Sequence, residues 1–101
     1  MKRQTLDGYV IDVLMPDLVG HDRTPAAFLV YLCLACAAER SGSASVAMSL
    51  QDLSTRTGLS KSSVQAAIRH LKRRALLDPT VAATTTRPVR RVAKPWLRRG
   101  G

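Results

Sequence analysis

The residues of this chain best suited to chemistry lie between Ser60 and Arg74, where hydroxyl, amide and cationic side chains gather. A glutamine can pair with the edge of adenine, a lysine with guanine, and a serine with either base. The candidates for reading base edges are therefore Lys61, Ser62, Ser63 and Gln65. Cations further along suit phosphate groups, namely Arg69, Lys72, Arg73 and Arg74. Ser60, at the expected helix start, adds a position that attracts a phosphate oxygen.

These side chains need a helix that is anchored from behind, and the surrounding pattern predicts one. Ser49 and Asp52 have the spacing of a capping box, which starts a first helix. Gly58 supplies the backbone conformation of a tight turn, and Ser60 caps a second helix. The second helix has a buried stripe at helical spacing, made of Val64, Ala67, Ile68 and Leu71. The sequence therefore predicts a helix-turn-helix, a layout that places its second helix in the DNA major groove.

The distribution of charge supports a polyanionic partner. The net charge of the chain is +9, but residues 1–54 carry a net −2 and residues 55–101 carry a net +11. A half-molecule this basic attracts nucleic acid, and binding that releases counterions weakens with salt. We therefore expect duplex DNA as the partner.

Two elements are expected before the helix-turn-helix. Residues 7–18 fit either a helix capped by Asp7 or a strand, and we favour the helix, which Pro16 would end or kink. Thr24 and Pro25 form a helix start, and residues 25–40 are apolar almost all round. A helix without a polar face is either the central element of the core or is partly covered by a second subunit. A short strand is expected at residues 46–48.

A basic β-hairpin is expected after the helix-turn-helix. Asp78-Pro79 predicts a turn, residues 80–86 are small and β-prone, and residues 89–92 again favour a strand. Arg87, Arg90 and Arg91 give this hairpin a second set of cations for the DNA backbone.

Residues 24–77, with the motif LSTRTGLSKSSVQAAIRHL, resemble the winged helix-turn-helix DNA-binding domain of bacterial transcription regulators and of phage and plasmid replication proteins. The segment YVIDVLMPDLVG is similar to the leading helix of the replication proteins. The resemblance implies an α+β, mainly α fold with a three-helix core and a β-hairpin wing near residues 77–92. The expected organisation is an N-terminal helix or arm at residues 1–22, the winged domain at 23–95 and a basic tail at 96–101. Ala75 departs from the family, which often has glycine there.

The remaining chemistry-bearing residues are predicted to be structural. Cys33 and Cys36 are spaced as CxxC, but they lie mid-helix, so we interpret them as core-packing thiols rather than a redox pair or a zinc site. His70 is expected at the surface or facing phosphate, and His21 in a loop. Trp96 could stack on a base, but packing of the tail on the core is favoured.

The sequence thus predicts a small transcriptional regulator that binds double-stranded DNA specifically, as a homodimer formed through residues 25–40 and the N-terminal segment. The alternatives are the DNA-binding domain of a replication initiator, which would bind tandem repeats, and a winged-helix module for protein interaction. No catalytic constellation is visible, so an enzyme is not expected, nor is a metal, a cofactor or a small-molecule ligand. The absence of a secretory signal or of a span of about 20 apolar residues predicts a cytoplasmic protein associated with the nucleoid.

Overall fold

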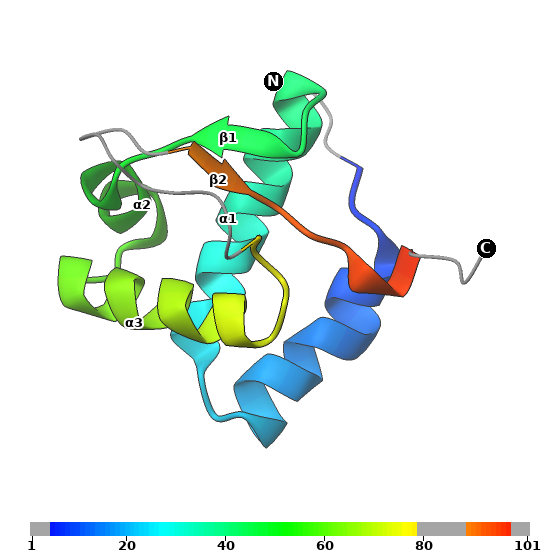
Figure 1. Cartoon of the computed structure of the whole chain (residues 1–101). Coiled ribbons are helices and arrows are strands. Elements are labelled where there is room, and N and C mark those ends of the chain that lie inside the picture. Colours follow the sequence, from blue (N-terminus) through cyan, green and yellow to red (C-terminus); the bar gives the residue numbers. More distant parts are fainter. Residues whose placement is uncertain (1–4, 79–88, 98–101) are drawn as a thin grey trace.

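The computed structural model describes residues 5–78 and 89–97 and has an α+β, mainly helical architecture (Figure 1). Helix α1 is central: it packs against the N-terminal segment, α2, α3 and β1. In Figure 1 the N-terminal segment lies on one side of α1 and α2 lies on the other. In chain order the elements are η1 (Val10–Leu14), η2 (Pro16–His21), α1 (Pro25–Ser41), β1 (Ser45–Ala47), α2 (Leu50–Thr57), α3 (Lys61–Arg73), β2 (Val89–Arg91) and η3 (Pro95–Leu97).

The N-terminal segment is helical, which confirms the favoured reading of residues 7–18. Asp7 starts it, because its Oδ1 accepts a hydrogen bond from the Tyr9 amide at 3.0 Å. Both η1 and η2 are wound as π-helices, and Pro16 falls at the joint between them. Pro16 opens η2, where a missing amide hydrogen costs little. The proline therefore divides the segment without ending it, and Val10, Leu14 and Leu18 still bury one face.

Helix α1 begins at Pro25, as predicted, and ends where Gly42 takes a left-handed conformation with φ of 72°. Thr24 stands at the cap position, but its hydroxyl donates to the Leu18 carbonyl at 3.1 Å instead of capping α1. One face of α1 lies in the core, through Ala27, Phe28, Val30, Tyr31, Leu34 and Ala35. Among the described residues, no helix is both long and apolar enough to cross a membrane.

The predicted pair of helices around a tight turn is confirmed. Ser49 and Asp52 form a full capping box at the start of α2. Gly58 ends α2 with a φ of 81°, a conformation that residues with a side chain resist. The Ser54 hydroxyl donates to the Leu59 carbonyl at 2.5 Å and holds the turn against α2. Ser60 then caps α3, since its Oγ accepts from the Ser63 amide at 3.2 Å.

The short strand expected at residues 46–48 is present at Ser45–Ala47 and pairs antiparallel with β2. Val46 lies opposite Arg90 in this register, and an isolated bridge joins Leu77 to Val92. The chain leaving α3 thus returns beside the strand that precedes α2. Residues 80–86, expected as the first strand of the basic hairpin, lie outside the described residues.

Trp96 packs on the body of the protein, as favoured from the sequence. Its ring stacks on Tyr9 with centroids 4.4 Å apart, and it meets Tyr31 edge-on. Its indole Nε1 donates to Asp7 Oδ2 at 2.8 Å. This hydrogen bond, followed by the bond from the Tyr9 amide, lowers the pKa of Asp7.

Candidate nucleic-acid interface

Helix α3 has one buried face and one polar, exposed face. The predicted stripe is buried, with Val64, Ala67, Ile68 and Leu71 packed into the core. The opposite face exposes Lys61, Ser62, Gln65, Arg69 and Arg73. Four of these residues, Lys61, Gln65, Arg69 and Arg73, recur every fourth position, so they form one row along the helix. We call them the α3 row.

The serines at the start of α3 bind one another. Ser60 Oγ lies 3.2 Å from Ser62 Oγ and 3.0 Å from Ser63 Oγ, while it also accepts from the Ser63 amide. These hydroxyls therefore already have hydrogen-bond partners within the protein, where they stabilise the first turn of the helix. Lys61 and Gln65 extend from the same two turns as exposed side chains.

Cations dominate the second half of α3. Arg69 and Arg73 are exposed, Lys72 is half-buried, and residues 61–73 contain no acidic side chain. Arg73 Nη2 lies 3.3 Å from the Nδ1 atom of His70. A row that starts with Lys and Gln and continues with two arginines can meet base edges near the helix start and phosphates further along.

Arg74, predicted as a phosphate contact, does not belong to this row. Its guanidinium pairs with Asp17 through Nη2 and binds both oxygens of Asp22 through Nη1, at 2.9 and 2.7 Å. The hydrogen bond to Asp17 is the main reason that the pKa of Arg74 is raised. Arg74 joins the end of α3 to η2, so its guanidinium is already engaged by two carboxylates of the protein.

His70, expected at the surface or facing phosphate, is half-buried and takes part in the same cluster. Its Nε2 lies 2.7 Å from Asp22 Oδ2, and only 18% of its side chain is exposed. Asp22 additionally bonds to the exposed His21, whose Nδ1 lies 2.9 Å from Asp22 Oδ1. The hydrogen bonds from His21 and His70 lower the pKa of Asp22, and the charge of Arg74 adds to this.

The π-helical winding of η2 explains why the sequence did not reveal this cluster. Asp17 and Asp22 are five residues apart, a spacing that would place them well apart around an α-helix. In η2 the amide of Asp22 bonds to the carbonyl of Asp17 at 2.8 Å, so both carboxylates come to the side where Arg74 lies. Asp17, His21 and Asp22 also have the donor types of a metal site, with ligand atoms within 4.8 Å of one another. Arg74 already balances the charge of both carboxylates there.

The three arginines predicted for the wing have different positions. Arg91 is exposed on β2, as a backbone contact requires. Arg90 is buried, with 8% of its surface exposed, and its Nε donates to the Met48 carbonyl at 3.1 Å. Burial lowers the pKa of Arg90. Arg90, predicted as a DNA contact, therefore ties β2 to the start of α2 from a buried position, while Arg87 lies outside the described residues.

Replacing Arg90 with alanine should lower the free energy of unfolding by about 1–2 kcal/mol, because it leaves the Met48 carbonyl without its donor. The dependence of DNA affinity on salt should stay unchanged. Arg91→Ala should do the reverse, with little loss of stability and a shallower dependence on salt. Urea denaturation and DNA titrations at several salt concentrations separate the two variants. A shallower dependence of DNA affinity on salt for Arg90→Ala would show that Arg90 contacts DNA.

The two thiols are free and half-buried on α1. Cys33 packs against the core, as predicted, whereas Cys36 is not part of that packing. Both line a groove of about 420 Å³ between α1 and α2 that also includes Leu29, Arg40 and Arg56. Burial raises the pKa of Cys33.

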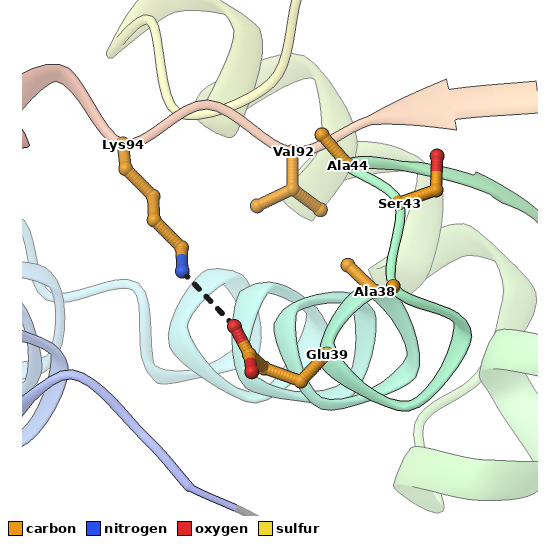
Figure 2. A pocket seen from close by; sticks show the side chains of 7 residues that line it. Ala38, Glu39, Ser43, Ala44, Val92 and Lys94 are labelled. Atoms are coloured by element: carbon orange, nitrogen blue, oxygen red, sulfur yellow. Dashed lines mark hydrogen bonds and ion pairs between the residues drawn. The ribbon is translucent and has the colours of Figure 1, made fainter.

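A second pocket, of about 430 Å³, lies at the end of α1 (Figure 2). Its wall includes Ala38, Ser43, Ala44 and Val92, and Lys94 pairs with Glu39 across it at 3.4 Å. The charged groups drawn there already satisfy each other, so this pocket offers less for recognition than the α3 row does.

The α3 row is thus the set of predicted site residues that the structure brings together most clearly. Arg91 lies on a separate strand, and the side chains of Arg74 and Arg90 make contacts inside the protein instead of joining the row. The resemblance of residues 24–77 to winged helix-turn-helix domains is supported by the sequence motif alone. Comparison of the chain with protein-family models, with curated proteins and with solved structures finds no match in any of the three.

Proposed function

We propose that this protein binds double-stranded DNA in a sequence-specific manner as a winged helix-turn-helix domain and acts as a small transcriptional regulator. The observation that carries the proposal is the α3 row, in which Lys61 and Gln65 are followed by Arg69 and Arg73 on one exposed face. Helix α3 would enter the major groove, which is wide enough to admit an α-helix.

The anchoring of α3 supports this assignment. A helix that reads bases must keep its position while it is pushed against the duplex, and α3 packs on both α1 and α2. At its far end, Arg74 and His70 bind Asp22 and hold α3 to η2. The row is therefore presented by a helix fixed at both of its ends, which suits direct reading.

The charge of this face favours DNA over a protein as the partner. The exposed side of α3 combines cations with Ser and Gln and has no acidic or large apolar side chain. Protein interfaces are enriched in aromatic and apolar residues and depleted in Lys at their centre. Arg91 adds a cation on β2, next to the segment where a wing would extend.

Selection of bound duplexes from a random library tests the proposal. Enrichment of a defined sequence, with binding that weakens as salt increases, is the expected result. Recovery of no duplex at low salt would refute DNA binding. Equal recovery of all sequences would remove the sequence-specific part and leave a non-specific DNA-binding protein.

Gln65→Ala should relax sequence preference more than it lowers overall affinity. A bidentate contact from glutamine to adenine discriminates by about 1–3 kcal/mol, whereas non-specific binding depends mainly on phosphates. Affinities for the selected site and for a scrambled site should therefore converge in this variant. Ala66→Ser, at the neighbouring exposed position, is the control. Equal losses on both duplexes would show that Gln65 does not read a base.

A further inference from the structure

Within residues 5–78 and 89–97, two exposed apolar surfaces lie outside the proposed DNA-binding face. The first is the groove between α1 and α2, which we call the α1 groove. Its wall is formed mainly by Leu29, Cys33, Cys36 and Ala37 of α1, with Arg40 and Arg56 at its edges. Leu29 is 42% exposed, and none of the described residues that line the groove is acidic. The groove is thus apolar with a positively charged border.

The second surface is on the N-terminal segment and lies next to one exposed carboxylate, that of Asp12. Ile11, Met15 and Val19 are spaced every fourth residue and are each about 40% exposed. We call these three residues the N-terminal ridge. Asp12, next to Ile11 in the chain, is exposed, whereas Asp7 accepts from Trp96 and Asp17 and Asp22 are paired with Arg74. The ridge is an apolar helical row with an acidic neighbour, which is the kind of element that fits a groove bordered by arginines.

We propose that the N-terminal ridge of one copy docks in the α1 groove of a second copy. Apolar side chains are buried on both sides of such a contact, and Asp12 comes near Arg40 and Arg56 of the neighbour. Pairing two grooves would bring four arginines together, and pairing two ridges would bring two aspartates together. Like charges across an interface are unfavourable, so charge selects the pairing of unlike surfaces.

This contact joins two different surfaces of the same chain. The ridge belongs to the segment on one side of α1, and α2, which forms the other wall of the groove, lies on the opposite side (Figure 1). A contact between unlike surfaces adds copies head to tail unless the rotation closes a ring. On DNA, and here the inference rests on the proposed DNA binding, head-to-tail copies match direct repeats better than a palindrome, which is the arrangement expected of the replication-initiator alternative.

Sedimentation of the whole chain without DNA tests the contact. The mass should rise with concentration for the native protein. Two variants should keep the mass of a monomer at all concentrations. The ridge variant carries Ile11→Ser with Met15→Ser, and the groove variant carries Arg40→Glu with Arg56→Glu. We expect each to weaken association by at least about tenfold. The control Val13→Ser removes an equally exposed apolar side chain that lies outside the row and should associate normally.

A mixture of the two defective variants gives the decisive result. The ridge variant keeps its groove and the groove variant keeps its ridge, so the mixture should form dimers that do not grow further. No dimer in the mixture, a native chain that stays monomeric into the millimolar range, or variants that associate normally would each overturn the proposal.

Alkylation of the native thiols provides a second readout. Cys33 and Cys36 line the groove, so their reaction with iodoacetamide should slow as the protein concentration rises. An unchanged rate at concentrations where the native chain associates would place the contact elsewhere. Because neither measurement uses DNA, a failure of DNA binding alone would leave this contact standing. Conversely, DNA binding by a chain that stays monomeric would refute only the contact.

Discussion

Replacing Arg69 and Arg73 together with alanine should weaken duplex binding by about 10- to 100-fold at moderate salt. Both side chains are exposed in the α3 row, and α3 provides no carboxylate that would neutralise them. If each meets one phosphate, the slope of log affinity against log salt should fall by about 2 in magnitude. Fluorescence anisotropy with a labelled duplex at several salt concentrations measures both quantities.

The matched control removes the same amount of charge from another face. Arg40 and Arg56 are also exposed, but they border the α1 groove. Replacing both with alanine should leave the salt slope nearly unchanged when the protein is dilute enough to be monomeric. If the two double variants lost affinity equally, net charge alone would account for binding, and the placement of α3 in the major groove would be wrong.

The Asp22→Asn variant should have the largest effect on stability, lowering the free energy of unfolding by about 2–3 kcal/mol. The Asp22 side chain is only 8% exposed and accepts from Arg74, His70 and His21. Removing its charge leaves the Arg74 guanidinium with Asp17 alone. Urea denaturation of the variant and of the native chain measures the difference. Asp12→Asn, at an exposed position of the same segment, should be nearly neutral.

The same carboxylate predicts how stability depends on pH. Hydrogen bonds from the two histidines and the charge of Arg74 lower the pKa of Asp22 below its ordinary value of 3.8. A lowered pKa means that the unfolded chain takes up the proton first as pH falls. The contribution of Asp22 is therefore complete above the ordinary value and is lost as pH falls through the folded one. Stability of the Asp22→Asn variant should vary less over this acidic range, and an equal decline in both proteins would contradict the assignment.

The helices and the turn around the candidate site could be predicted because their signals are local. Ser49 and Asp52 lie one turn apart, Gly58 meets a backbone requirement of its own position, and the buried stripe of α3 repeats at helical spacing. Each of these signals depends on neighbours within a few residues. The exposed α3 row follows directly, since a helix buried on one side presents the other.

The positions of Arg74 and Arg90 could not be predicted, because they depend on distant residues. Arg74 meets Asp22 across 52 positions of the chain, and Arg90 meets the Met48 carbonyl across 42. From the sequence alone, every arginine is an equally good candidate for a phosphate contact, so both are predicted to bind DNA. Only the folded arrangement shows that a carboxylate and a carbonyl inside the protein already hold them.

The stacking of Trp96 on Tyr9 limits the order in which parts of the protein can fold during translation. Tyr9 leaves the ribosome well before its aromatic partner Trp96, and Tyr31 leaves it well before the Ala93 carbonyl that accepts from its hydroxyl at 3.0 Å. The first helical segment and α1 therefore wait with their aromatic side chains uncovered while α2 and α3 emerge. A nascent chain stalled before Trp96 should be more open to proteases near Tyr9 than the finished protein is.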